Sequence, residues 1–398
     1  MDQDKKISRR AMLISAASAG AAVLAAPMIN RGRFQLFAGS TVEYSTKAID
    51  LVERSTVLDM LCVLTLDFPK FNEWMKNPEL FTEADLKPWK DSGINVIHPA
   101  VGMGGFNSYD SVLKFFAAWN GFIANHDEHF MRIDSVADLA RVKKSGKLGV
   151  LLGLQNSDQF RNPNDVDFFH ALGQRVSQLT YNSRNFIGNG ATERRDEGIS
   201  DFGAAIIERM NKVGMAVDVS HCGDRTTLDA FEISKKPVLI THSNVRSLVA
   251  GHPRLKTDEA IKKVGAAGSV IGITGVRMFV KNDEPTTIEH VLDHFDHVRK
   301  LIGPQHLGVG SDIDLYGYDS MPPAINKQLR AGYKDSYGFR EKIDIEGLNH
   351  PKRMFDLTEG LIRRKYTDAD IEGILGGNFK RVLSQIWTAA APVETPKP

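Results

Sequence analysis

Two histidines and one aspartate in the second half of the chain each follow a short apolar run. His221 ends the run Asp-Val-Ser-His, His242 lies in Thr-His-Ser-Asn, and Asp312 follows Gly-Ser. Neutral imidazole and carboxylate groups are common ligands of divalent metal ions, and a metal ion with one open position can activate a water molecule. A lone histidine after a strand is usually structural, but these three residues together predict a metallohydrolase centre.

Four other polar residues lie near the ends of apolar runs and are candidates for the same centre. Asp59 lies within the first run, His98 ends the second, and Gln155 and Tyr181 follow the third and fourth. Asp312, Gln155 or His98 could complete the shell of a metal ion on the two histidines. Asp59 is expected to face the interior, where a buried carboxylate needs a metal ion or an arginine as its partner. For Asp59 and His98, a ligand role and a structural hydrogen bond both stay open.

The elements that would position these residues are βα units. From about Thr56 onward, short β-rich apolar runs alternate with stretches of helical period, which predicts a parallel sheet. Eight expected strands favour a closed (β/α)8 TIM-like barrel with C-terminal helices. An open doubly wound sheet is the competing architecture, but no Gly-x-Gly-x-x-Gly loop follows the first strand. The expected strands are Val57–Leu64, Ile94–Pro99, Leu148–Leu154, Ser177–Thr180, Met215–Asp218, Val238–Thr241, Ser269–Ile273 and Leu307–Gly310, and the expected helices include Asp110–His126, Asp201–Val213, Asp224–Ile233, Asp258–Ala266 and Thr287–Ile302.

A barrel would bring the candidate residues together, because the C-terminal ends of its strands build the active site. His221, His242 and Asp312 follow the fifth, sixth and eighth expected strands. The stretch 314–351 is polar, rich in Gly and Tyr, and longer than an ordinary connection. We expect it to form an elaborated loop over one face of the barrel.

The two ends of the chain are expected to lie outside the barrel domain, residues 56–388. Residues 1–26 have basic residues before an apolar, Ala-rich run, and the pair Arg9-Arg10 resembles a twin-arginine signal. We expect cleavage near Ala26, export by the twin-arginine machinery and a periplasmic location. An ordinary secretory signal or an uncleaved membrane anchor stays open. Residues 27–55 form a lead-in, the last helix is expected at Asn378–Trp387, and residues 389–398 form a disordered tail.

Composition excludes several classes of protein. The 398 residues include 50 basic and 49 acidic side chains, and the net charge of +1 gives no long-range attraction to nucleic acid or an anionic bilayer. Cys62 and Cys222 are too few for a disulfide scaffold and lie in no Cys-x-x-Cys pair. Cys62 is expected to point outward, towards the helices, as a buried inert thiol, and a disulfide between the two stays open.

Three further histidines have helical spacing and are expected to lie on an outer helix. His290, His294 and His297 occur within the expected helix Thr287–Ile302. Their spacing could bind a metal ion. Histidines on the outer helices of barrels usually face solvent, so we expect these three to do the same.

Several stretches resemble the membrane (renal-type) dipeptidases, zinc-dependent relatives of the amidohydrolase barrels. The resemblance covers most of the chain after the signal and is clearest from Ser177 to Ile273. The matching stretches occur in the order and spacing of that family: Leu179–Asn182, Gly198–Gly203, Asp218–His221, Thr241–Asn244, His252–Arg254, Gly308–Asp314 and Leu375–Phe379.

The resemblance implies roles for four residues. His221 and His242 match the two histidine ligands of the second zinc ion, and Arg254 matches the arginine that binds the substrate carboxylate. Asp312 matches the aspartate that engages the substrate amine and moves protons. Dimers are common in the family, so a homodimer is possible for this chain.

This chain departs from the family where the first zinc ion would bind. The family's Asp-Gly-His-Asn-Asp stretch reads Asp-Met-Leu-Cys-Val from Asp59, so both ligands are replaced by apolar residues. Gln155 stands in the place of the glutamate that bridges the two ions, and Tyr181 in the place of a histidine that polarises the scissile carbonyl. Because a neutral amide offsets the repulsion of two cations poorly, we expect one zinc ion rather than two, and absence of metal stays open.

Two functions from different classes follow. The first is a periplasmic dipeptidase-like metallohydrolase that cleaves the amide bond of a dipeptide or a related small amide with a metal-activated water. In it Arg254 holds the substrate carboxylate, Asp312 moves the proton and Tyr181 donates a hydrogen bond to the oxyanion. The second is a catalytically altered, metal-poor protein of the same fold that binds a peptide-derived ligand or helps it to mature. The four intact positions favour the first function.

Overall fold

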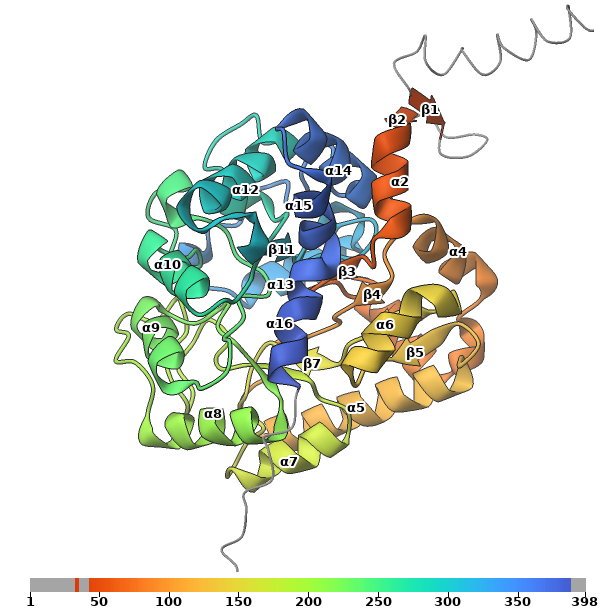
Figure 1. Cartoon of the computed structure of the whole chain (residues 1–398). Helices are drawn as coiled ribbons and strands as arrows, with labels where there is room; N and C mark the ends of the chain where they lie inside the picture. The colour runs from red at the N-terminus through yellow and green to blue at the C-terminus, as the bar shows by residue number, and fades with distance from the viewer. Residues whose placement is uncertain (1–32, 36–42, 388–398) are drawn as a thin grey trace, which may run out of the picture.

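The computed structural model describes residues 33–35 and 43–387 (Figure 1). The signal expected at residues 1–26, its cleavage near Ala26 and the tail expected at 389–398 lie outside the described residues. Two short strands, β1 (Arg33–Gln35) and β2 (Glu43–Ser45), pair antiparallel before the main domain.

The main domain is a (β/α)8 barrel. Its parallel strands form three runs of neighbours. Single bridges join two of the junctions between these runs, and at the third the chain continues from β6 to β7 within the third expected strand. The bridge between Cys62 and Ile313 connects the last strand to the first, so the sheet closes. The sixth expected strand is present only as bridges, from Leu239 to Asp218 and from Ile240 to Ile271. The strands are β3 (Leu58–Asp59), β4 (Val96–Ile97), β6 (Leu148–Val150), β7 (Gly153–Leu154), β8 (Val176–Gln178), β9 (Ala216–Asp218), β10 (Ile271–Ile273) and β11 (Leu307–Val309).

Helices surround this barrel (Figure 1). Three of them, α8, α9 and α10, have the bounds that the sequence predicts. Ser200 begins α8 by accepting a hydrogen bond from the amide of Gly203, and Gly214 ends it with a left-handed φ of 84°. The helices are α2 (Thr46–Arg54), α3 (Phe68–Lys76), η1 (Pro78–Leu80), α4 (Glu83–Asp91), α5 (Ser108–Asn125), α6 (Val136–Ser145), α7 (Asn164–Ala171), α8 (Asp201–Val213), α9 (Asp224–Ile233), η2 (Arg246–Leu248), α10 (Asp258–Ala266), α11 (Arg277–Val280), α12 (Ile288–Ile302), η3 (Pro304–His306), η4 (Tyr318–Ser320), α13 (Pro323–Ala331), η5 (Asp335–Tyr337), α14 (Arg353–Arg363), α15 (Asp368–Glu372), η6 (Gly373–Gly377) and α16 (Asn378–Ile386).

Helix α16 closes the end of the barrel at which the strands begin, and it crosses the front of the view in Figure 1. Its apolar face packs in one buried cluster with residues from the beginnings of several strands, including Leu58, Val96 and Val176. The helix residues of this cluster are Phe379, Val382, Leu383 and Ile386. A functional site in the barrel must therefore open at the other end, where the strands finish.

Three features differ from the sequence-based expectation. A ninth parallel strand, β5 (Phe130–Arg132), extends the sheet beyond β6. The stretch 314–351 is not one loop, because it contains α13 and two short 3-10 helices. His294 does not face solvent: it is fully buried, accepts a hydrogen bond from the amide of Val245 at 3.1 Å and lies 3.0 Å from the carbonyl of Val280.

The cysteines are free and buried. Cys62 is buried, as expected, and its Sγ lies 3.2 Å from the guanidinium of Arg353, a residue of helix α14, in a polar cluster with Asp59.

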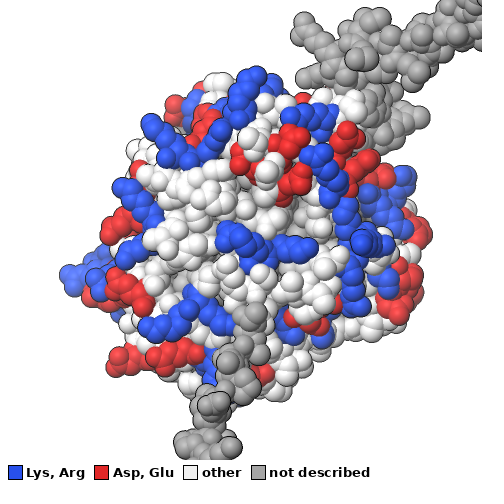
Figure 2. Space-filling view, viewed as in Figure 1, with Lys and Arg blue, Asp and Glu red and all other residues white. Residues whose placement is uncertain are grey.

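The face shown in Figure 2 carries charged side chains of both signs, mostly around a largely uncharged interior. Basic and acidic side chains alternate around its rim, and neither sign covers it. This agrees with the net charge of +1 and offers no basic patch there for nucleic acid. None of the helices within residues 43–387 is long and apolar enough to cross a membrane.

Candidate active site

The imidazoles of His221 and His242 face each other at the ends of the fifth and sixth strands. Their Nε2 atoms lie 2.9 Å apart, and both side chains are buried. Asp218, at the end of β9, ties the two loops together: it accepts hydrogen bonds from the Ser220 hydroxyl at 2.6 Å and from the Thr241 hydroxyl at 2.6 Å. Asp218 lies three residues before His221, but its local sequence does not indicate this role.

The hydrogen-bond partner of Nδ1 in each ring determines which ring nitrogen carries the proton. Nδ1 of His221 lies 2.8 Å from Oδ1 of Asn182, which can only accept. Nδ1 of His242 lies 2.8 Å from the Thr241 hydroxyl, whose own proton goes to Asp218. Both rings therefore carry their proton on Nδ1, and two Nε2 lone pairs point at each other.

Burial also prevents either histidine from taking up a second proton. The pKa of His221 and the pKa of His242 both lie well below the usual value, first because burial disfavours the charged form and then because of the positive charge of Arg254. Two unprotonated nitrogens at this distance can both bind one cation through their lone pairs. The pair is thus organised to bind a cation.

Tyr181 covers this pair. Its ring stacks on His221 with centroids 4.3 Å apart and planes 24° apart. Its hydroxyl contacts the hydroxyl of Tyr333, which lies two residues after α13. An added Cβ at Gly102 would lie 2.6 Å from the Tyr181 ring, so this loop residue must be glycine for the ring to keep its place. Tyr333 is a site residue that the sequence analysis missed.

Arg254 is fully buried without an anionic partner. Its guanidinium donates to the carbonyl of Ser220, to the carbonyl of His242 at 2.9 Å and to the Ser243 hydroxyl at 3.3 Å. All three acceptors are neutral, Nε has no partner, and within the described residues no carboxylate forms an ion pair with it. A buried charge without a counter-charge is costly, so this guanidinium is organised to receive an anion.

Asp312 follows the eighth strand in a left-handed conformation, with φ of 64°. Such a conformation is strained for a residue other than glycine and is often found at functional sites. Burial raises the pKa of Asp312 to about 7; Arg254 opposes this shift and Asp59 adds to it. Within the part of the chain that the structure describes, no group donates a hydrogen bond to its carboxylate, which leaves it free for a substrate or a proton.

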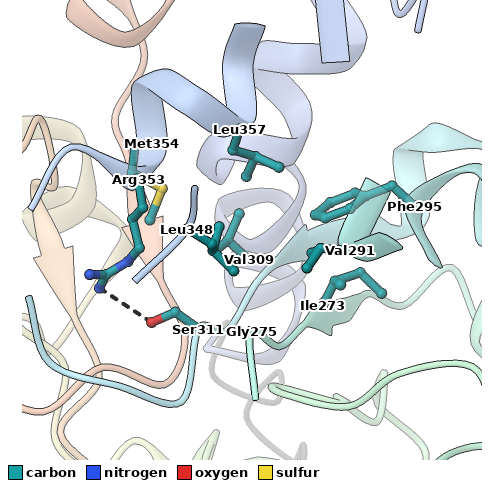
Figure 3. Close-up of a pocket in the computed structure, with 10 residues that line it drawn as sticks. All are labelled: Ile273, Gly275, Val291, Phe295, Val309, Ser311, Leu348, Arg353, Met354 and Leu357. Atoms are coloured by element: carbon teal, nitrogen blue, oxygen red, sulfur yellow. Dashed lines mark hydrogen bonds between the residues drawn. The ribbon is translucent and has the colours of Figure 1, made fainter. Parts of the chain in front are cut away.

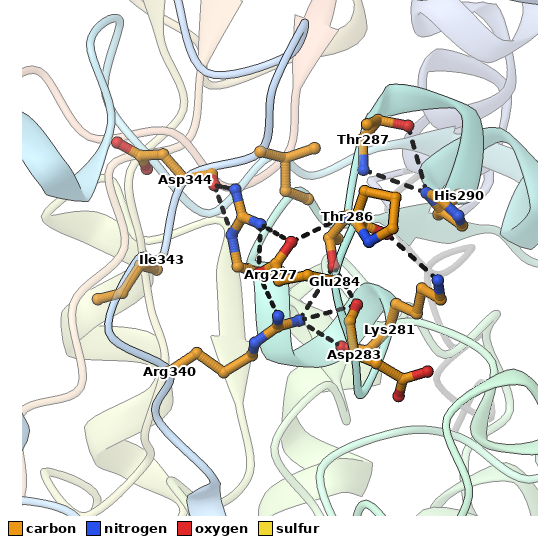
Figure 4. Close-up of polar contacts among 12 residues, drawn as sticks. Arg277, Lys281, Asp283, Glu284, Thr286, Thr287, His290, Arg340, Ile343 and Asp344 are labelled. Carbon is orange, nitrogen blue, oxygen red and sulfur yellow. Dashed lines mark hydrogen bonds and ion pairs between the residues drawn. The ribbon is translucent and has the colours of Figure 1, made fainter.

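The 314–351 stretch is anchored beside this site by the ion-pair network in Figure 4. Glu284 binds Arg277 with contacts of 2.7 and 2.8 Å and also contacts Arg340, which comes from this stretch. Nε of Arg277 donates to the carbonyl of Asp344 at 2.8 Å. The network places the Tyr333 region next to Tyr181, so the stretch forms one wall of the site.

Comparison with known proteins identifies the family. The sequence profile of the membrane dipeptidases (peptidase family M19) matches residues 47–328 and 338–397. The chain belongs to this family. Dipeptidase tcpJ of Claviceps purpurea is 30% identical over 258 residues, which are 64% of this chain and 55% of that protein. Dipeptidase verJ of Clonostachys rogersoniana is 30% identical over 262 residues, 63% of this chain and 64% of that protein, so the match spans less than two thirds of either relative.

Solved structures show the same fold. An amidohydrolase from Pseudomonas aeruginosa is 28% identical, with a TM-score of 0.73 over 85% of this chain and 99% of that one. The probable dipeptidase PvdM from Pseudomonas aeruginosa has a TM-score of 0.71 at 18% identity and covers 86% and 98% of the two chains. A metallopeptidase from Rhodobacter sphaeroides, liganded with a phosphinate mimic of the dipeptide L-Ala-D-Ala, has a TM-score of 0.68 at 15% identity, covering 84% and 99%.

For a membrane dipeptidase, the site has lost part of its metal-binding capacity. Leu61 and Val63 provide no ligand atoms. Gln155 uses its amide to donate to the carbonyl of Ala100 at 2.9 Å. Asp59 uses both carboxylate oxygens in hydrogen bonds, one to the amide of Ser311 at 2.8 Å and one to Arg353 at 3.0 Å.

His98 makes no hydrogen bond with the pair within the described residues. Its Nδ1 lies 2.7 Å from the carbonyl of Met60, and its Nε2 has no partner and points at Gly153, where an added Cβ would lie only 2.1 Å away. Across residues 33–35 and 43–387, no three His, Cys, Asp or Glu side chains gather as a metal-binding group. The residues therefore do not fit the family's two-ion centre, whereas the His221–His242 pair fits a single ion.

Proposed function

We propose that this membrane dipeptidase relative is a hydrolase that cleaves the amide bond of a dipeptide or a related small amide with a free carboxylate. The observation that carries the proposal is the buried Arg254 guanidinium with no anionic partner, a short distance along the chain from His242. A substrate carboxylate would supply the missing charge with charge-assisted hydrogen bonds. Family membership and the similarity to two dipeptidases support the reaction class.

His221 and His242 would hold one zinc ion through their facing Nε2 atoms. When bound, zinc lowers the pKa of a coordinated water and polarises a carbonyl. The hydrogen bonds from Nδ1 to Asn182 and Thr241 would orient the two ligands, as is usual for metal-binding histidines. Because no third His, Cys, Asp or Glu of the described residues gathers with the pair, the pair would hold one ion rather than two.

Asp312 would act as the proton carrier. Its pKa of about 7 lets it accept a proton from the attacking water near neutral pH and pass that proton to the leaving amine, so that the amide C–N bond breaks and the carboxylate is regenerated. Tyr181 would donate a hydrogen bond to the developing oxyanion. It can do so while it accepts the proton of Tyr333, because a phenol oxygen both donates and accepts.

We further propose that the chain acts in the periplasm after export through the twin-arginine machinery, and that it forms a homodimer. The basic residues and paired arginines before the apolar run support the export route. A folded-export route would let the protein acquire its metal ion before it crosses the membrane.

A second candidate function is ligand binding without hydrolysis. The replaced ligands at Leu61, Val63 and Gln155 favour it, since each removes part of the family's metal centre. In that case the Arg254 pocket would bind a peptide-derived carboxylate, and the protein would protect the ligand or help it to mature.

Incubation of the zinc-loaded protein with L-Ala-D-Ala and with L-Ala-L-Ala distinguishes the hydrolase from the ligand-binding function. The hydrolase proposal predicts release of free alanine from at least one dipeptide by the wild type and none by His221→Ala. Binding of either dipeptide in calorimetry, with no release of alanine at any zinc concentration, would overturn the hydrolase and favour the second function.

A further inference from the structure

Arg353, the first residue of α14, reaches from outside the barrel to the turn that carries Asp312 (Figure 3). Its side chain is 1% exposed. One terminal nitrogen lies 3.0 Å from Asp59 and 3.2 Å from the Ser311 hydroxyl, and the other donates to the carbonyl of Asp314 at 2.8 Å. Arg353 therefore contacts the residue before Asp312 and the second residue after it.

Asp59 holds the same turn from the side of the first strand. One carboxylate oxygen binds Arg353 and the other accepts the amide of Ser311 at 2.8 Å. Ser311 is thus held at its backbone by Asp59 and at its side chain by Arg353. Within the described residues, the backbone of Asp312 itself has one hydrogen bond, from its amide to the carbonyl of Leu61 at 2.8 Å.

This pair is unusual in the molecule. Among the ion pairs of the described residues, it alone has both side chains buried, with exposures of 1% and 0%. Burying two charges costs several kcal/mol per ion before their attraction is counted, so such a pair contributes little to stability. Its location at the Asp312 turn, beneath a strained φ of 64°, points to a structural task that apolar packing would not perform.

We propose that Arg353 is a positioning residue, which together with Asp59 fixes the turn 311–314 so that the Asp312 carboxylate faces the substrate. The inference rests on the proposed function for the role of Asp312, but the fixing of the turn is independent of it. Arg353 touches neither the substrate nor the histidine pair. It acts through Ser311 and Asp314.

Hydrogen exchange measured by mass spectrometry tests the fixing of the turn without any need for activity. We expect the rate of hydrogen exchange in the peptide covering 311–314 to rise by about 10-fold in Arg353→Met and in the double variant Asp59→Leu/Arg353→Met. The rate of exchange in the barrel strands should not change. The double variant removes both charges and leaves no orphaned ion, so it remains informative if the single variant unfolds. Unchanged exchange at 311–314 in the double variant would overturn the proposal.

Arg175→Met is the matched control. Arg175 is also mostly buried and pairs with Asp134 at 3.2 Å, but it lies at the beginning of β8, at the closed end of the barrel. Its loss should leave exchange at 311–314 unchanged. A rise there equal to that in Arg353→Met would show a general loosening and would also overturn the proposal.

The kinetics of hydrolysis of the dipeptide L-Ala-D-Ala test whether the turn matters for catalysis. A misplaced Asp312 lowers kcat by about 100-fold while KM changes little, because a displacement of about 1 Å at a reacting group has that effect on rate. Arg353→Lys, which keeps one contact, should recover part of this loss. Equal kcat in wild type and Arg353→Met would contradict the positioning role. A wild type that hydrolyses no dipeptide would instead contradict the proposed function, and the exchange experiment alone would then test whether Arg353 fixes the turn.

Discussion

The Nε2 atoms of His221 and His242 lie 2.9 Å apart, and neither carries a proton. Asn182 and the Thr241–Asp218 pair fix the proton of each ring on Nδ1, and burial lowers both pKa values. Two lone pairs this close together can both bind the same cation. This relationship remains in a chain that has lost the other ligands expected for its family.

Removal of the Asn182 side chain tests the orientation of His221. Asn182 has φ of 56°, so glycine is the replacement that keeps the backbone unstrained. Asn182→Gly should weaken zinc binding by about 10–100-fold, which is the usual effect of losing a hydrogen bond to a metal-binding histidine. A competition titration with a chromophoric chelator measures it. Lys365→Gly, at another residue with positive φ of 62°, is the control and should bind zinc as the wild type does.

Loss of Arg254 should affect only substrates with a free carboxylate. Arg254→Met is expected to raise KM for L-Ala-D-Ala by about 10–100-fold, the factor that corresponds to a lost hydrogen bond to a charged group. The C-terminally amidated dipeptide, which has no carboxylate, serves as the control substrate, and its KM should rise much less. An equal rise in KM for the two substrates would contradict the carboxylate-binding role of Arg254.

The ionisation of Asp312 predicts how activity depends on pH. Because burial raises its pKa to about 7, the carboxylate that accepts the proton forms only as the pH rises through 7. The value of kcat/KM should therefore increase between pH 6 and 8 with a midpoint near 7. Asp59→Asn removes a negative charge that raises this pKa, so the midpoint should fall. A flat profile in the wild type would contradict the assignment.

The same group predicts how stability depends on pH. A carboxyl group whose pKa is raised on folding favours the folded state while it is protonated, and this contribution is lost as the pH rises from about 4 to about 7. Asp312→Asn cannot ionise. Compared with the wild type, the variant should therefore gain in Tm as the pH rises from 5 to 8, as measured by thermal unfolding. A constant difference in Tm would show that Asp312 does not titrate in this range.

The contact between the hydroxyls of Tyr181 and Tyr333 can be tested by a double-mutant cycle. Tyr181→Phe and Tyr333→Phe each remove one hydroxyl and keep the ring. The effects of two residues in contact should not add, with a coupling of about 0.5–3 kcal/mol in the activation free energy calculated from kcat/KM. Tyr366→Phe, which loses a hydroxyl that donates to Asp296, is the control remote from the site. Additive effects would show that Tyr333 does not act through Tyr181.

The sequence predicted the barrel well because its signals are local. Apolar runs marked the strands, and capping residues such as Ser200 and Thr257 marked the beginnings of α8 and α10. The meeting of His221 and His242 followed from the geometry of parallel strands, but the described structure does not gather Asp312 with them into a metal-binding group, so that part of the prediction is wrong. The strand β5 was missed because it lies outside the barrel repeat.

The remaining site residues depend on long-range contacts that a local pattern does not contain. Arg353 lies 294 positions from Asp59, and Tyr333 lies 152 positions from Tyr181. Asp59 could be recognised as a buried carboxylate in need of a metal ion or an arginine, but only the fold shows that the partner is an arginine. His294 was misjudged for the same reason, because α11 and the loop after His242 cover it in space.

The metal content of the purified protein tests the central claim most directly. Protein prepared without chelator is loaded with zinc, freed of excess and analysed by inductively coupled plasma mass spectrometry, with His221→Ala/His242→Ala in parallel. A single-ion site on the two histidines predicts about one zinc per chain in the wild type and none in the double variant. Two ions per chain, or no zinc in the wild type after loading, would contradict it.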